Sequence, residues 1–253
     1  MIKFGDLDLQ TNEIIVSSVQ YRQMADRILN TTPISRRSGN KYLSDDFTTK
    51  TIVMEGHVVA TSASGLIGIV DNMHRYLAIS QQDLVIDTDR VYIATCSRAE
   101  FPELSFTRTT TPFTLEFLSA QPYAYGDNLV AGFTIPSGVL VSTIPTVISG
   151  SAYAEPQLTL TTASGVGDAG FTRIAINHVN TGAEVVISGS WSRNIETVLN
   201  YDNATVTLSG LLQDYTGNFD TFPVGNNSLR ITFTGNNDFG VDGQITYLPR
   251  YYF

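Results

Sequence analysis

Cysteine is almost absent from this chain of 253 residues, in which Cys96 is the only one. A single cysteine excludes an intramolecular disulfide and a thiolate metal cluster. Positive charge is scarce as well, because 15 Lys and Arg stand against 24 Asp and Glu, for a net charge of −9. Binding to nucleic acid through a basic face is therefore not expected, since phosphates are neutralised by clustered Lys and Arg. The acidic balance either confers solubility or provides a wall past which DNA slides without binding.

Long apolar runs are also lacking. No run approaches the ~18 residues that a membrane-spanning helix needs. Asp6 and Asp8 stand where a signal peptide would have its apolar core, so we expect synthesis in the cytoplasm without export. With 42% hydrophobic and 15% charged residues, the composition indicates a folded chain rather than a disordered one. The length suits two domains of ordinary size.

Patterns that carry chemistry are missing. His57, His74 and His178 have no spacing typical of a zinc site, and no serine lies in a Gly-x-Ser-x-Gly frame. The glycines of ASGVGDAG are not followed by the Gly-Lys-Ser/Thr of a phosphate-binding loop. The acidic turn NNDFGVDG does not have the spacing of an EF-hand. We therefore predict no enzyme, no catalytic residues, no metal and no cofactor.

The first half of the chain is expected to form a mixed domain, residues 1–130, with a β-barrel or split sheet and one helix. β-branched and aromatic residues cluster in its predicted strands. These strands are Ile14–Val16, Thr51–Val59, Leu84–Ile86, Val91–Ala94 and Phe113–Leu118. Apolar residues recur at helical spacing near 63–79, where Ser62 or Ser64 is a plausible N-cap. The helix should cover one face of the sheet.

The segment Ile34–Asp46 differs in character from its surroundings. It contains Arg36, Arg37 and Lys41, the densest positive charge in the chain, around Ser38-Gly39-Asn40. This composition predicts an exposed loop or the tip of a hairpin. Such a tip is either a solvated loop or a docking arm.

The second half, residues 131–253, is predicted to be an antiparallel β-sandwich, because short strands alternate with Gly, Asn, Asp and Ser turns and no helical pattern remains. A typical strand alternates Leu229, Ile231 and Phe233 with polar residues, and Gly225-Asn226-Asn227 is expected to be the turn before it. The other strands are expected at Val139–Val141, Gln157–Thr161, Arg173–Ile176, Glu184–Ile187, Thr205–Leu208 and Gln244–Leu248.

A sugar-binding module is the alternative that a sandwich leaves open. Trp191, with Tyr201 and Tyr215, could form a platform on which a sugar ring stacks. A lone Trp is, however, more often a core residue. A glycoside hydrolase is the weaker alternative, since it needs two carboxylates placed across the sugar, and the sequence does not single out a pair.

Several motifs in order resemble siphophage distal tail proteins. The first half carries RRSGNKYLSDDF, the helix of SASGLIGIVDNMHRYLA, VYIATC and the boundary PYAYG. The second half carries GNFDTFPVGNNSLRITFTG and the ending QITYLPRYYF. The matching residues are Phe222, Pro223, Gly225, Asn227, Tyr247, Pro249, Arg250 and Tyr251. The likeness spans almost the whole chain, although RRSGNKY is shorter or poorer in glycine than the corresponding segment of many relatives.

The resemblance implies a structural protein of the virion, assembled in the host cytoplasm. In that family a ring, usually of six copies, joins the tail tube to the tip hub or baseplate. The N-terminal domain forms the inner belt and a galectin-like sandwich projects outward. The implied partners are further copies of the chain, the tail tube protein, the tip hub, the tape measure protein and receptor-binding components. The residues expected to contact a neighbouring subunit are Arg36, Arg37, Lys41 and Tyr42.

Overall fold

The computed structural model describes residues 1–33, 40–87, 90–102, 104–105, 107–163 and 170–252. For residues 33, 40–42 and 44–46 it describes the backbone alone. The chain divides into two compact units, one made of Met1–Gly126 with Tyr251–Phe253 and the other of Asp127–Arg250. The sequence placed the boundary near residue 130 and did not predict that the chain returns to the first unit after Arg250.

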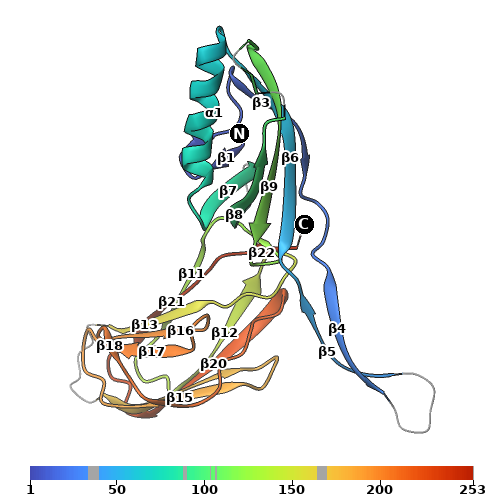
Figure 1. Ribbon diagram of the computed structural model, residues 1–253. Coiled ribbons are helices and arrows are strands. Elements are labelled where there is room, and N and C mark those ends of the chain that lie inside the picture. The colour runs from blue at the N-terminus through green and yellow to red at the C-terminus, as the bar shows by residue number, and fades with distance from the viewer. Residues whose placement is uncertain (34–39, 88–89, 103, 106, 164–169, 253) are drawn as a thin grey trace. The chain divides into compact units, whose positions relative to one another are not determined.

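The first unit is built on a nine-stranded sheet, seven strands of which follow the order β2-β1-β7-β8-β9-β6-β3 (Figure 1). Of the other two strands, β10 pairs with β8, and β22 pairs with β10. Of the predicted architectures, this is a sheet with a separate hairpin rather than a closed barrel. Its central strands β6 and β9 pair over ten residues, from Lys50 opposite Ser119 to Val59 opposite Thr110. The strands are β1 Lys3–Phe4, β2 Leu7–Asp8, β3 Ile14–Gln20, β6 Lys50–Val59, β7 Gln82–Asp87, β8 Arg90–Glu100, β9 Thr110–Ser119, β10 Ala124–Tyr125 and β22 Arg250–Tyr251.

The single helix among the described residues, α1 (Ala63–Leu77), lies along one face of this sheet, as the apolar spacing predicted. Ser62 is the N-cap, and its side chain accepts a hydrogen bond from the amide of Gly65 at 3.1 Å. The helix buries Leu66, Val70, Met73 and Leu77. Leu66, Met73 and Leu77 join Phe4, Ile52, Met54, Tyr92, Phe113 and Phe117 in the core of the first unit.

Two further strands, β4 (Arg27–Pro33) and β5 (Asn40–Phe47), pair only with each other among the described residues and form a separate ribbon (Figure 1). We call it the arm. Of the segment Ile34–Asp46, for which an exposed loop or the tip of a hairpin was expected, residues 40–46 belong to β5, and residues 34–39 lie outside the described residues. The sequence did not predict β4, because Asn30-Thr31-Thr32-Pro33 is not an apolar alternation.

The second unit is a sandwich of a six-stranded sheet, β11-β21-β13-β16-β17-β18, and a five-stranded sheet, β12-β20-β14-β15-β19. Side chains from both sheets share one core, as the sequence predicted. The strands of the first sheet are β11 Leu129–Ile135, β13 Gln157–Thr162, β16 Glu196–Asn200, β17 Thr205–Leu208, β18 Leu211–Leu212 and β21 Val241–Tyr247. Those of the second are β12 Val141–Ile148, β14 Phe171–His178, β15 Glu184–Ser188, β19 Tyr215–Gly217 and β20 Gly225–Gly235.

Two local predictions about the sandwich were wrong. Gly225-Asn226-Asn227 is not a turn, because the three residues pair with Ile148, Val147 and Thr146 as the start of β20. Within β20, a positive φ occurs only at its two end residues, Gly225 and Gly235. The strand expected at Val139–Val141 begins at Val141, because the amide of Val139 is bonded to the carbonyl of Pro136 in a turn.

Candidate assembly surfaces and motif residues

The described residues contain no cluster that resembles a metal centre. No group of three or more His, Cys, Asp or Glu side chains there could hold a metal ion. The histidines lie apart, in β6, α1 and β14. Within the described part of the chain, no helix is long and apolar enough to cross a membrane.

The motif residues of the second half close the sandwich. The ring of Phe222 is fully buried and stacks on His178, with 4.2 Å between ring centroids. The side-chain amide of Asn227 donates to the carbonyls of Pro223 (2.7 Å) and Gly225 (3.0 Å). These two bonds fix the amide orientation, so the oxygen of Asn227 faces Nε2 of His178 at 3.0 Å. Asn227 therefore ties the Pro223–Gly225 segment to β14 from inside the core.

The histidine in this cluster is held on both sides. Its Nε2 hydrogen points at the Asn227 oxygen, so Nδ1 is the acceptor in the neutral ring and receives the hydroxyl of Thr181 at 2.9 Å. The side chain is 2% exposed. Every polar atom of the buried ring is thus satisfied, which makes His178 a structural residue of the sandwich.

The motif at the chain's end is also buried. The hydroxyl of Tyr247 donates to the carbonyl of Val147 at 2.9 Å and accepts from the amide of Ser149 at 3.0 Å. Pro249 is buried, and Tyr251 already belongs to the first unit. The signature residues thus serve the internal fold rather than an exposed surface, with Pro223 as the exposed exception.

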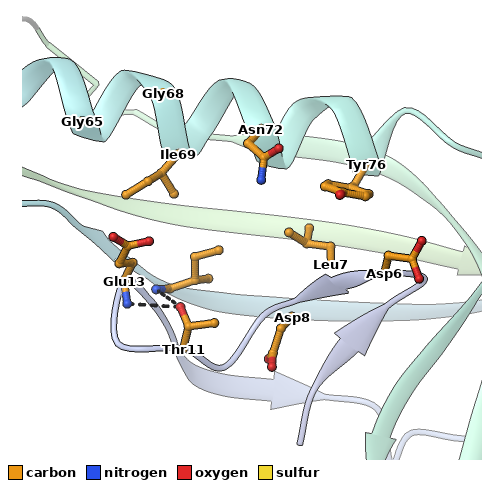
Figure 2. Close-up of a pocket in the computed structure, with 11 residues that line it drawn as sticks. Asp6, Leu7, Asp8, Thr11, Glu13, Gly65, Gly68, Ile69, Asn72 and Tyr76 are labelled. Carbon is orange, nitrogen blue, oxygen red and sulfur yellow. Dashed lines mark hydrogen bonds between the residues drawn. The ribbon is translucent and has the colours of Figure 1, made fainter.

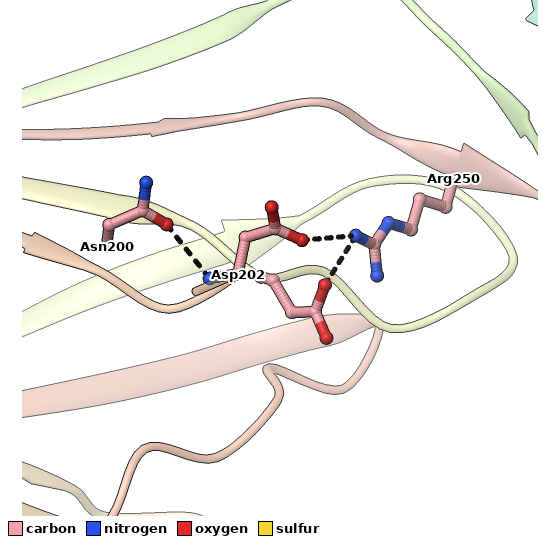
Figure 3. Close-up of polar contacts among 4 residues, drawn as sticks. Asn200, Asp202 and Arg250 are labelled. Carbon is pink, nitrogen blue, oxygen red and sulfur yellow. Dashed lines mark hydrogen bonds and ion pairs between the residues drawn. The ribbon is translucent and has the colours of Figure 1, made fainter. Parts of the chain in front are cut away.

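Arg250 forms the centre of a polar cluster in the sandwich (Figure 3). Its guanidinium, with a side chain 7% exposed, bonds the Glu155 carboxylate at 2.5 Å and lies 3.8 Å from the more exposed carboxylate of Asp202. The Asp202 loop is held by its amide, which donates to Asn200 at 3.0 Å. The main chain of Arg250 accepts from the amides of Ser151 and Ala152. Side chain and backbone together lock the last residue of the sandwich unit onto the loop 150–155.

The sugar-stacking hypothesis for Trp191 is wrong in this structure. Its side chain is 2% exposed, its ring packs on Phe171 and its Nε1 donates to the hydroxyl of Thr197 at 2.8 Å. Tyr201 is buried as well, and burial raises its pKa. Trp191 and Tyr201 are therefore core residues, and the half-buried Tyr215 packs against the same core.

Of the predicted contact residues, Arg36 and Arg37 lie outside the described residues. Lys41 and Tyr42 lie on β5, paired with Thr32 and Thr31 of β4. The arm also carries exposed apolar side chains that the sequence analysis did not single out. Ile28 is 53% exposed, and Leu29 and Leu43 are each 57% exposed. None of the arm's described side chains belongs to the core of the first unit. A ribbon that exposes such side chains has the character of a surface that another chain covers.

A groove of about 440 Å³ runs beside α1 (Figure 2). Asp6, Asp8 and Glu13 line it, so it is acidic. On the helix side Gly68 leaves it open, because a Cβ at that position would have no heavy atom within 4 Å. The hydroxyl of Thr11 accepts the amides of Glu13 and Ile14 and so fixes the loop on the opposite side.

Lys50, at the start of β6, is a buried cation that the sequence analysis missed. It is 1% exposed, and its ammonium donates to the hydroxyl of Tyr92 and to the carbonyl of Tyr252, each at 3.2 Å. Burial lowers the pKa of Lys50 to about 8, and the nearby Arg90 acts in the same direction. Burial raises the pKa of Tyr92 to about 12. The sequence does contain a signal for the burial of Lys50. Ile52 and Met54 lie on the buried face of β6, and position 50, two residues earlier, lies on the same face.

Comparison with known proteins rests on structure alone. No family model and no curated protein sequence matches the chain. Among solved structures, the Dit (gp 19.1) protein of phage SPP1, described as a paradigm of the hub adsorption apparatus in phages that infect Gram-positive hosts, superposes with a TM-score of 0.73. The match covers 98% of each chain at 11% identity.

Two chains of the phage P2 baseplate in its activated conformation, with Ca and with Sr, are more distant. Their TM-scores are 0.44 and 0.46 at 9% identity, over 95% of this chain and 92% of theirs, and we draw nothing from them. The SPP1 match includes both units. At 11% identity, what the comparison shows is a shared fold. This chain therefore has the fold of the phage distal tail protein Dit, and the resemblance drawn from its sequence is confirmed at the level of the fold.

Proposed function

We propose that this chain is a structural component of a phage tail tip, a distal tail protein that assembles into a ring of about six copies between the tail tube and the tip hub or baseplate. The observation that carries the proposal is the SPP1 Dit match over 98% of both chains. The chain acts in the virion and is not an enzyme. Its partners are further copies of itself, the tail tube protein and the tip hub, with the tape measure protein and receptor-binding components as further neighbours.

The arm is the part of the molecule that best suits contact with another copy. Its segment 27–47 contains Arg27, Arg36, Arg37 and Lys41 against Asp45 and Asp46, a net charge of +2 by sequence, whereas the chain as a whole has −9. Opposite charge on the remainder of a neighbouring copy favours encounter and register. Burial of Ile28, Leu29 and Leu43 would supply the apolar part of the contact.

Light scattering with negative-stain electron microscopy of the purified protein tests the proposal. We expect closed rings with a central opening and a mass several times that of the 27.6 kDa chain. A matched pair of variants locates the contact. Ile28→Ser with Leu29→Ser should lower the assembled mass, whereas Leu211→Ser with Leu212→Ser, at the still more exposed edge of the sandwich, should not. A monomer at every concentration up to about 100 µM contradicts ring formation by this chain.

The basic residues of the arm give a second test. Exposed charge contacts contribute only ~0.2 to 1 kcal/mol each, so Arg36, Arg37 and Lys41 are expected to act as a set. Replacing all three with Ala should impair assembly most at low salt and less at higher salt, where the charges of the original protein are screened, while the monomer still folds. Normal assembly of the triple variant rejects their role and leaves the apolar contact to be tested by the first pair.

A further inference from the structure

The arm is held by little of its own structure. A two-stranded ribbon is at best marginally stable in water, and β4 and β5 have no third strand among the described residues. Its first rung is Arg27 opposite Phe47, where the guanidinium lies over the Phe47 ring at 5.2 Å. Whatever contacts this rung therefore controls how well the base of the arm is fixed.

The C-terminal residues of the chain contact the pair Arg27–Phe47. The ring of Tyr252 lies 4.9 Å from that of Phe47 and 6.5 Å from that of Tyr123. Tyr251 lies under the guanidinium of Arg90 at 4.7 Å, and β22 pairs with β10. We call Tyr251–Tyr252 the strap. Its two rings contact different elements of the first unit, Tyr251 the Arg90 side chain of β8 and Tyr252 the Phe47 ring of β5.

Lys50 joins the strap to the sheet at the same place. It lies three residues after Phe47, at the point where the arm passes into β6. Its ammonium donates to the strap at the Tyr252 carbonyl and to Tyr92 of β8, and lies 4.9 Å from the centre of the Tyr92 ring. A buried charge-assisted hydrogen bond to a carbonyl is stronger than a neutral one and is costly to leave unmade.

We propose that the strap, closed by Lys50, is a latch that fixes the base of the arm. Lys50 and Tyr252 are thus positioning residues, separated by 202 positions in the chain, and the arm is ordered only when the chain through Tyr252 is in place. The inference rests on the proposed function in one respect, the arm's role in assembly. The latch itself lies wholly within the first unit.

Hydrogen exchange read by mass spectrometry on the full chain tests the latch. In Tyr252→Ala, amides of β4 and β5 should exchange about tenfold faster, with β13 and β14 of the sandwich unchanged. Lys50→Met keeps the apolar stem but removes the donors, and should give the same pattern. Tyr252→Phe keeps the ring and the carbonyl and should exchange like the original protein. Fluorescence of Trp191, the only Trp, reports that the sandwich is folded in each variant.

Unchanged exchange in the arm of Tyr252→Ala, with β22 released, overturns the latch. Equal acceleration through β6 and β9 overturns it as well, because the strap would then support the whole sheet rather than the arm. Light scattering separates the two proposals. If the arm loosens while the assembled mass stays normal, the latch stands and the arm's role in assembly fails. If the original protein never assembles, the proposed function fails while exchange still decides the latch.

Discussion

The sandwich unit closes its core with one continuous stretch of chain, Asp127–Arg250, whereas the first unit is completed by Tyr251–Phe253 from the other end of the sequence. Inside the sandwich, Phe222, Asn227 and Arg250 are buried and bonded within the unit. The first unit instead extends a ribbon with exposed Ile28 and Leu29 beyond its core. The difference indicates that the motif residues of the second half stabilise the sandwich. Contact with other chains is therefore best sought at the arm, whose sequence has no regular apolar alternation.

The largest expected effect breaks the sandwich from inside. Phe222→Ala removes a fully buried ring that stacks on His178 and contacts Tyr201 edge to face, and should lower the free energy of unfolding of the sandwich by about 3–5 kcal/mol. Urea unfolding followed by Trp191 fluorescence measures it. Val224→Ala, two residues further and 45% exposed, is the control and should change the value by no more than about 0.5 kcal/mol. Similar losses in both variants would contradict a structural role for the motif.

The Arg250 cluster sharpens the same point. Arg250→Met should cost about 3 kcal/mol, since it leaves the Glu155 carboxylate, 23% exposed, without its cation. Asp202→Asn removes the outer carboxylate, 69% exposed at 3.8 Å, and should cost less than about 1 kcal/mol. Trp191 fluorescence again reports the unfolding. If Asp202→Asn were the more damaging change, the ion pair with Glu155 would not be the main contact.

The pH dependence of stability distinguishes the first unit from the sandwich. The folded pKa of Lys50, about 8, lies below its ordinary value of 10.5, so the unfolded chain binds more protons between these values and stability rises with pH there. From pH 7.5 to 9.5 the gain should be about 2 kcal/mol. The pKa of Tyr92 is raised from 10.0 to about 12, so the folded chain binds more protons at this group above pH 10. Tyr92 therefore makes stability fall with pH, but only above pH 10.

Urea unfolding followed by far-ultraviolet circular dichroism checks this dependence. Trp191 fluorescence reports the unfolding of the sandwich, so its contribution can be separated from that of the first unit. Lys50→Met should remove it from the first unit and leave the sandwich transition as it was. A Lys50→Met protein that keeps the full rise between pH 7.5 and 9.5 would show that another group titrates.

The smallest effect concerns the helix of the first unit. Gly68 is exposed in the middle of α1, and a Cβ there meets nothing within 4 Å. Gly68→Ala should therefore stabilise the first unit by about 0.5–1 kcal/mol. Gly56→Ala is the contrasting change, because its Cβ would lie 2.2 Å from the carbonyl oxygen of Ile15, and it should destabilise the same unit. Thermal unfolding of the two variants measures both signs.

Sequence periodicity predicted the elements whose side chains alternate between a core and another face. In β6, β13 and β20 a buried residue recurs at every second position. The predicted bounds were close for β6 and β13, whereas β20 extends beyond the predicted Leu229–Phe233 at both ends. In α1 the apolar spacing and Ser62 gave both the helix and its cap. In these elements the apolar side chains are the buried ones, and an apolar pattern predicts an element through the face that it buries.

Two of the missed elements, β11 and β4, lack such a pattern, whereas β16 was missed although its side chains alternate. β11 is exposed along most of its length, and β4 has no core to alternate against. Asn227 was taken for a turn residue because its type favours turns, whereas here its side chain is buried and bonds the backbone of Pro223 and Gly225. The contact of Lys50 with Tyr252 joins residues 202 positions apart, which no local pattern can bring together.

The most direct test of the account compares hydrogen exchange in dilute protein with that in protein concentrated enough to assemble. We expect assembly to protect the arm, β4 and β5, and to leave the exposed sandwich edge β18, with Leu211 and Leu212, exchanging as before. Protection that appears at β18 while the arm is unchanged would contradict the assignment of the assembly contact to the first unit.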